Sequence, residues 1–144
     1  MTADDRPPTI DRSQPSAVFN RLERLKPIPM LPSLTSQTLP RQELTPETIQ
    51  EMFDVFNENF SQTSLDLFTR DLNNKNWVIL IRDDEKNIVQ GFSTLGIYET
   101  EYQGQCITAV YSGDTIIRRA YWGTPELPKK WIHTVLEKTA DMPQ

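Results

Sequence analysis

The clearest place for chemistry in this sequence is the segment TIIRRAYWGTPE, residues 115–126. β-Branched residues in its first part predict a strand, and Gly123 predicts a turn. Thr124, Pro125 and Glu126 then have the residue types of a helix N-terminus. A strand that enters a helix through a glycine turn presents free backbone N–H groups, with which proteins commonly hold phosphate. The segment therefore predicts an anion or cofactor site, although many strand–turn–helix units hold no ligand.

The other reactive side chains form no recognisable catalytic set. Glu99, Glu101 and Asp114 are candidate bases near predicted strand ends, where carboxylates are usually solvated. His133 is expected to be partly exposed, without catalytic partners. Cys106 has no basic neighbour in sequence to lower its pKa, and we expect it to be a small buried residue. With one cysteine and one histidine, the sequence predicts no internal disulfide and no metal site, and it assigns no catalytic residue.

Composition limits the class of protein. The chain has 144 residues, of which 37% are hydrophobic, and a formal net charge of -5, which suits one domain with a real core. The net negative charge argues against a protein that coats nucleic acid or an anionic membrane, although basic residues occur locally at 118–119 and 129–130. The longest apolar run, residues 77–81, is too short for a membrane span, and residues 1–12 lack a signal-peptide core. A soluble protein of the reducing cytoplasm is predicted.

Two regions differ in composition. Residues 1–35 hold most of the prolines together with many polar residues, which predicts a flexible leader. Residues 17–26, AVFNRLERLK, are a possible short helix in it, and the leader is interpreted either as a plain flexible segment or as a docking arm for a partner. Residues 36–140 are predicted to form the folded domain.

The folded region begins with two predicted amphipathic helices. Thr45-Pro46-Glu47 has the residue types of a helix start, and Ser64 to Asn73 predicts a second helix. Apolar residues follow at helical spacing, which we interpret as core rather than as a ligand groove: Ile49, Met52, Phe53, Phe56 and Phe60 in the first helix, and Leu65, Phe68 and Leu72 in the second.

An antiparallel meander is predicted after the helices. The apolar run at 77–81 predicts a strand covered on both faces. The predicted turns and strands that follow are a hairpin turn at 82–87, a long strand at 88–98, a turn at 99–105 and a third strand at 106–118 with a turn or bulge at 112–114. A further short strand is possible at 36–43. The order of helices and strands predicts an α+β fold on an antiparallel sheet.

This order resembles the first half of the GNAT superfamily of N-acetyltransferases. The phrase NIVQGFSTLGIYET, residues 87–100, is similar to the family's third strand. Residues 115–126 resemble its fourth strand and pyrophosphate loop, whose signature is Q/R-x-x-G-x-G/A. The resemblance covers about residues 36–138. It implies a truncated acyl-CoA N-acyltransferase-like fold, acetyl-CoA as cofactor and an amine as acceptor.

The resemblance also implies a set of cofactor-binding residues. The backbone of Ile116, Ile117 and Arg118 would face the pantetheine, and the N–H groups of Tyr121, Trp122, Gly123, Thr124 and Glu126 would face the pyrophosphate. Lys129 or Lys130 would add a charge contact. The alternative is that residues 121–122 pack the helix onto the sheet and the two lysines form a solvated face.

The sequence departs from the family pattern in two ways. Ala120 replaces the expected Gln or Arg, and Pro125 replaces the second Gly or Ala, so that Pro125 and Pro128 supply no N–H and Glu126 adds negative charge. These departures predict weak cofactor affinity. The family's fifth strand and fourth helix have no counterpart, so we expect the chain to be incomplete as a single-chain enzyme, with a homodimer or partner chain completing the sheet. The alternative is a non-enzymatic interaction module that uses an open sheet edge.

Overall fold

The computed structural model describes residues 33–144. The possible helix at 17–26 and all but the last residues of the predicted leader lie outside this range, so those two expectations stay predictions. None of the helices in the described range is long and apolar enough to cross a membrane.

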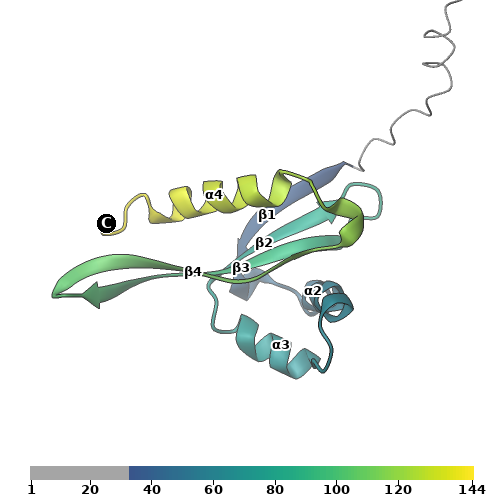
Figure 1. Cartoon of the computed structure of the whole chain (residues 1–144), viewed down its shortest axis with the longest axis horizontal. Coiled ribbons are helices and arrows are strands. Elements are labelled where there is room, and N and C mark those ends of the chain that lie inside the picture. Colours follow the sequence, from purple (N-terminus) through teal and green to yellow (C-terminus); the bar gives the residue numbers. More distant parts are fainter. Residues whose placement is uncertain (1–32) are drawn as a thin grey trace, which may run out of the picture. The chain divides into compact units, whose positions relative to one another are not determined.

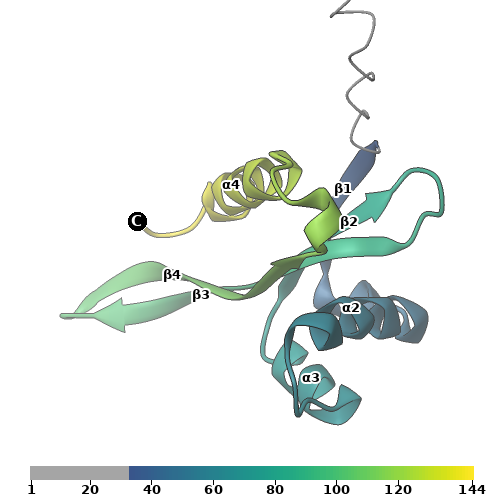
Figure 2. The same cartoon turned by 45° about the vertical axis from the view of Figure 1, so that its right-hand side comes forward.

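Four antiparallel strands form one sheet in the order β1-β2-β3-β4. Helices α2 and α3 cover one face of this sheet, and helix α4 covers the other (Figures 1 and 2). The elements in chain order are β1 Leu34–Pro40, η1 Arg41–Glu43, α2 Pro46–Asn59, α3 Leu65–Leu72, β2 Trp77–Asp83, β3 Val89–Tyr102, β4 Gln105–Ile117, η2 Arg119–Tyr121 and α4 Glu126–Thr139. The α+β class and the predicted order, including the first short strand, are confirmed.

Side-chain caps start the two N-terminal helices where the sequence predicts them. The Thr45 hydroxyl accepts a hydrogen bond from the Thr48 N–H (3.2 Å), and the Ser64 hydroxyl accepts one from the Leu67 N–H (3.2 Å). Each bond satisfies one of the N–H groups that a helix leaves without an intrahelical partner. The two helices bury their apolar faces together, with the Phe68 ring 5.7 Å from that of Phe53.

Two apolar cores lie on opposite faces of β2. Val78 and Leu80 pack on the side of α2 and α3, while Ile79 and Ile81 pack on the side of α4. Successive side chains of a strand point to opposite faces, so a strand covered on both sides must be apolar at every position. The uninterrupted run at 77–81 therefore has the structure that the sequence predicts.

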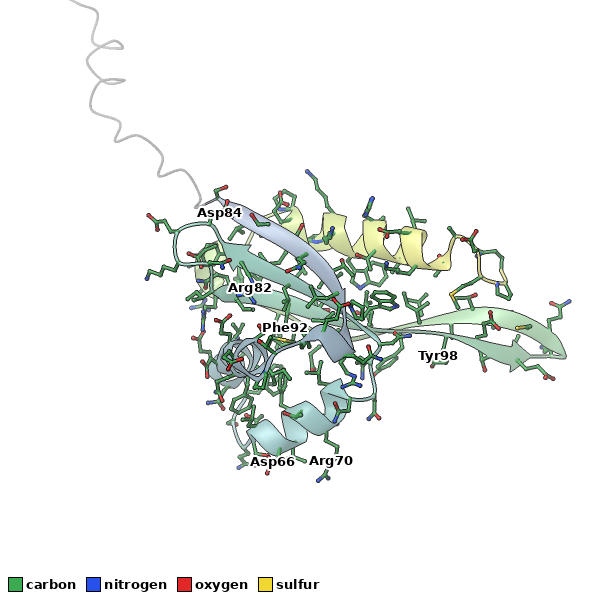
Figure 3. All side chains as sticks on the ribbon, turned by 180° about the vertical axis from the view of Figure 1, so that it is seen from behind. Asp66, Arg70, Arg82, Asp84, Phe92 and Tyr98 are labelled. Carbon is green, nitrogen blue, oxygen red and sulfur yellow. The ribbon has the colours of Figure 1, made fainter. Side chains whose placement is uncertain are left out.

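The hairpin of β3 and β4 is longer than predicted. Residues 99–102 and 105 belong to strands, and the turn is confined to Gln103 and Gly104, both with positive φ. β2 pairs with β3 only up to Leu95, so the far part of the hairpin projects beyond it (Figure 1). The segment has a polar sequence because its strand residues are exposed. Tyr98 lies at the base of the projection (Figure 3).

A β-bulge interrupts the pairing of β3 with β4. Ser93 pairs with Thr115 and Leu95 with Ser112, so that Gly113 and Asp114 together oppose Thr94. An extra residue of this kind bends the strand and increases its twist. The prediction of a turn or bulge at residues 112–114 is confirmed as a bulge.

Gly91 is required by the close approach of β3 and β4. A Cβ at this position would lie 2.9 Å from the Ile116 carbonyl oxygen and 2.9 Å from Ile117 Cγ1. We expect Gly91→Ala to lower the free energy of unfolding by about 1–3 kcal/mol, because the strands must shift to admit the methyl group. Urea unfolding monitored by circular dichroism measures this loss.

Gly96→Ala is the matched control for that substitution. Its Cβ would meet the Tyr98 ring at 3.6 Å and Tyr111 Cβ at 3.8 Å, which are ordinary contacts. It should be neutral or stabilise the protein by up to about 1 kcal/mol, since alanine loses less backbone entropy than glycine. Equal losses for the two variants would contradict the close approach at Gly91.

Candidate ligand-binding site

A groove of ≈ 610 Å³ lies between the outer edge of β4 and helix α4. In the described part of the chain β4 is an edge strand, so its outer side pairs with no other strand. The groove is mainly lined by apolar and aromatic side chains: Ser112, Thr115, Ile117, Tyr121, Gly123, Thr124, Leu127, Pro128, Trp131 and Ile132. A largely apolar hollow with a few polar groups is typical of small-molecule sites.

Helix α4 forms one wall of the groove because three contacts hold it to the sheet. Leu127 is buried in the core that contains Ile79 and Ile81. The Thr134 and Thr38 hydroxyls lie 2.7 Å apart and share a hydrogen bond between α4 and β1. Trp131 Nε1 donates to Ser112 Oγ (3.3 Å), which joins α4 to β4 next to the bulge.

The carbonyl of the peptide group between Ile117 and Arg118 points to the open edge of β4. The Arg118 N–H donates to the Gln90 carbonyl of β3 (2.9 Å). The N–H and C=O of one trans peptide point in opposite directions, so the Ile117 carbonyl points away from β3. The Ile116 carbonyl oxygen, in contrast, faces β3, because it lies close to Gly91 of that strand. The Ile117 N–H therefore also points to the open edge.

The Arg118 side chain is held by a network on the α2 side of the sheet. Its Nε lies 3.0 Å from Glu58 Oε1 and 3.1 Å from Oε2. Its terminal nitrogen donates to the Gln90 side-chain oxygen (3.0 Å) and to the Val89 carbonyl (3.2 Å). These contacts fix the end of β4 and leave the guanidinium away from the groove.

The loop after β4 uses most of its N–H groups internally. Tyr121 and Trp122 donate to the Arg118 and Arg119 carbonyls (2.9 and 3.1 Å), and Thr124 donates to the Tyr121 carbonyl (3.3 Å). The Glu126 N–H donates to the Thr124 hydroxyl (3.3 Å). Within residues 33–144, the N–H groups of Gly123 in the loop and of Leu127 in the first turn of α4 have no hydrogen-bond partner. Few donors therefore face a ligand at this turn.

Gly123 and Pro125 mark the entry to α4. Gly123 has φ +91, a conformation that favours glycine, and a Cβ there would meet no atom within 4 Å. The helix itself begins at Glu126, with Pro125 at the N-cap, one residue later than predicted. The Thr124 hydroxyl makes a short-range turn contact rather than the expected helix cap.

Seven of the eight predicted cofactor-binding residues are divided among three hollows, and Arg118 lines none of them. Ile117, Tyr121, Gly123 and Thr124 line the main groove. Ile116, Ile117 and Trp122 line a second hollow of ≈ 280 Å³ at the end of α2. Glu126 lines a third hollow of ≈ 370 Å³ together with Lys129 and Lys130, and Arg118 is engaged with Glu58.

The candidate bases are not brought together. Glu99 and Glu101 are exposed on the projecting hairpin, and His133 is exposed on α4, with its Nδ1 3.7 Å from Glu137. Cys106 is exposed, 3.9 Å from Glu99, so the expectation of a buried cysteine is wrong because its strand lies in the part of the hairpin beyond the core. Among residues 33–144 there is no group of three side chains that could hold a metal ion.

Sequence reasoning missed the α4 wall of the groove. Leu127, Trp131 and Val135 recur at a spacing of four, which is the pattern of a helix face that packs on a sheet. Ile132 and Pro128 lie beside that face and complete the lining. Helical periodicity predicts that Leu127 and Trp131 share a face, but the contact of Trp131 with Ser112 depends on the bulge.

Asp114, at the bulge, is partly buried. Burial raises the pKa of its carboxyl above the ordinary value of 3.8, and the nearby Asp71 carboxylate raises it further, while Lys75 opposes the shift. The folded state therefore holds this proton more tightly than the unfolded state. The corresponding stability is present below the unfolded pKa and is lost as pH rises through the folded pKa.

We expect Asp114→Asn to be more stable than the wild type at pH 7 and to have a smaller advantage at about pH 3.5, below the ordinary pKa of 3.8, where proton uptake by the wild-type carboxyl lowers the cost of its burial. Urea unfolding at both pH values measures the difference. Glu101→Gln, the same chemical change on an exposed strand residue, is the control. A variant with no advantage over the wild type at pH 7 would contradict the unfavourable burial of the Asp114 charge.

No family model and no curated protein sequence matches this chain. Its structure is similar to a probable N-acyltransferase from Enterococcus faecalis V583, with a TM-score of 0.56 and 15% identity over 73% of this chain and 27% of that one. The chain thus spans about a quarter of that protein's length.

Two further structures have the same arrangement. Glucosamine-6-phosphate N-acetyltransferase from Arabidopsis thaliana matches with a TM-score of 0.53 and 12% identity over 75% of this chain and 76% of that one. An acetyltransferase from Trypanosoma brucei matches with a TM-score of 0.50 and 12% identity over 75% of each chain. At these identities the likeness establishes the fold alone: residues 33–144 have an α+β fold like that of the matching parts of these acyltransferase structures.

Proposed function

We propose that the groove between β4 and α4 binds the pantetheine arm of acetyl-CoA, and that the protein is related in function to N-acetyltransferases that acylate an amine. The observation that carries this proposal is the outward-facing Ile117 backbone beside a mainly apolar groove that ends at the Gly123 turn. A pantetheine arm has amide groups that can pair with a strand edge and methylene groups that can pack on apolar side chains.

The loop geometry refines the proposed cofactor contacts. The Ile116 carbonyl and the Arg118 N–H face β3, and the Arg118 carbonyl accepts from Tyr121, so Ile117 is the proposed pantetheine contact of the three. Gly123 and Leu127 would donate to the pyrophosphate at the N-terminus of α4. The Glu126 carboxylate and the two prolines oppose this contact, so the apolar groove would supply most of the affinity.

The proposed ligand would be only partly enclosed by the described residues. Beyond β4 the described part of the chain offers no strand to cover the other side of the groove. We propose that a second copy or a partner chain supplies that side when an amine is acylated. Acetyl transfer itself needs mainly a well-positioned thioester and a base for the amine proton.

Gly123→Val tests the cofactor site. Its φ of +91 is strained for a β-branched residue, so the turn should rearrange and acetyl-CoA binding should fall by at least about tenfold, the equivalent of about 1.4 kcal/mol. Calorimetric titration with acetyl-CoA measures the affinity. Gly104→Val is the matched control, because Gly104 has φ +76 and equally open surroundings at the far end of the hairpin.

Three results would have different meanings. Loss of binding in Gly123→Val alone supports the proposed site. If Gly123→Val binds acetyl-CoA as tightly as Gly104→Val does, the cofactor does not bind at the Gly123 turn. No binding by the wild type at millimolar acetyl-CoA would overturn the cofactor proposal and leave the second candidate.

The second candidate is a non-enzymatic interaction module that uses the open edge of β4. The projecting hairpin favours it, because unpaired strand edges attract further strands and this hairpin also exposes Tyr98, Tyr102 and Tyr111. Its two strands are held to the C-terminal segment by the Thr108 hydroxyl, which donates to the Pro143 carbonyl. Two-stranded ribbons are marginally stable in water, so pairing with a second copy would stabilise the hairpin further.

Val110→Lys tests edge pairing. Val110 lies on β4 with 38% of its surface exposed, and a lysine on an edge strand hinders association. If β4 pairs with a second copy, the wild type should dimerise and Val110→Lys should dissociate at about tenfold higher concentration, by analytical ultracentrifugation. Leu67→Lys, on an exposed position of α3, should associate like the wild type. A wild type that stays monomeric at all concentrations would contradict this candidate.

A further inference from the structure

The indole of Trp122 is hydrogen-bonded to the backbone carbonyl on which the proposed cofactor site depends. Trp122 Nε1 donates to the Ile117 carbonyl with a distance of 2.9 Å. That carbonyl points to the open edge of β4, because the N–H of the same peptide bonds to Gln90 on β3. The side chain of Trp122 therefore takes the position that a ligand or strand N–H would otherwise fill.

The surroundings of Trp122 allow the indole to leave. Trp122 is 58% exposed and belongs to neither of the two apolar cores. The Arg119 guanidinium lies 5.1 Å from the centre of its ring, an exposed cation–π contact of modest strength. Gly123 follows directly, and a Cβ there would meet no atom within 4 Å. Movement of the indole would break one hydrogen bond and would not open the core.

We propose that Trp122 determines which ligands bind at the β4 edge, because its indole N–H donates to the Ile117 carbonyl in the place of a ligand amide. This inference rests on the proposed function. A ligand with an amide N–H that reaches the Ile117 carbonyl can replace the indole without leaving the oxygen unpaired. A ligand that has no such donor can enter the apolar groove but gains no hydrogen bond by moving the indole, so the Trp122–Ile117 contact stays in place.

The same contact accounts for the position of Trp122 outside the main groove. Tyr121 and Gly123 line the groove, whereas Trp122 lines the hollow at the end of α2. Thr115 and Ile117 border both hollows, so the indole lies at the boundary between them. Its displacement would expose the Ile117 carbonyl to a ligand in the groove.

Trp122→Phe tests this inference, because it keeps an aromatic ring beside Arg119 and removes only the donor. Acetyl-CoA should bind Trp122→Phe about two- to tenfold more tightly than the wild type, since the ligand no longer displaces a hydrogen bond. Calorimetric titration measures both affinities. Tyr98→Phe, which also removes only a donor from an exposed aromatic side chain and lines neither hollow, is the matched control and should bind like the wild type.

The outcomes separate this inference from the proposed function. Equal or weaker binding by Trp122→Phe, with clear binding by the wild type, would overturn the role of the indole and leave the cofactor site standing. No binding by any of the three proteins would overturn the cofactor site and this inference with it. If thermal melting shows that Trp122→Phe does not fold, Trp122→Leu also lacks the donor and carries the same expectation.

Discussion

The hydrogen bonds of Arg118 are the contacts on which the candidate site depends. Its backbone N–H and its guanidinium both bind β3, and the guanidinium also reaches Glu58 on α2. They hold the last residues of β4 in the sheet and fix the direction of the Ile117 peptide. The groove, the Gly123 turn and the start of α4 all follow this point in the chain, so their positions are set by how β4 ends.

The site combines a well-formed groove with few backbone N–H groups that could bind a phosphate. Helix α4 is held to the sheet by Leu127, by the Thr134–Thr38 hydrogen bond and by Trp131, so the groove wall has little freedom to move. The adjoining loop, in contrast, uses the N–H groups of Tyr121, Trp122 and Thr124 for its own turns, and Pro125 in the loop and Pro128 in α4 supply none. Affinity for a ligand would therefore come from apolar contact and edge pairing more than from anion binding.

Local patterns in the sequence predicted the elements whose structure depends on local physics. The cap at Thr45, the helix that begins after Ser64, the doubly buried strand at 77–81 and the bulge at 112–114 are all formed. The length of the β3–β4 hairpin was not predicted, because charged residues such as Glu99 and Glu101 in an exposed strand look like a turn.

Long-range contacts explain the remaining differences. The engagement of Arg118 with Glu58 joins residues 60 positions apart, and the Trp131–Ser112 hydrogen bond depends on where the bulge places Ser112. The exposure of Cys106 follows from the projection of the hairpin beyond β2. None of these contacts leaves a periodic pattern in the sequence.

Backbone amide chemical shifts, recorded by NMR during titration with acetyl-CoA, test the central claim most directly. If the groove holds the cofactor, the largest changes should fall on Ile117, Gly123 and Leu127 and on the indole N–H of Trp122, while the amides of α3 stay unchanged. Changes confined to the exposed face around Lys129 and His133, or no changes at saturating acetyl-CoA, would contradict a cofactor site at the edge of β4.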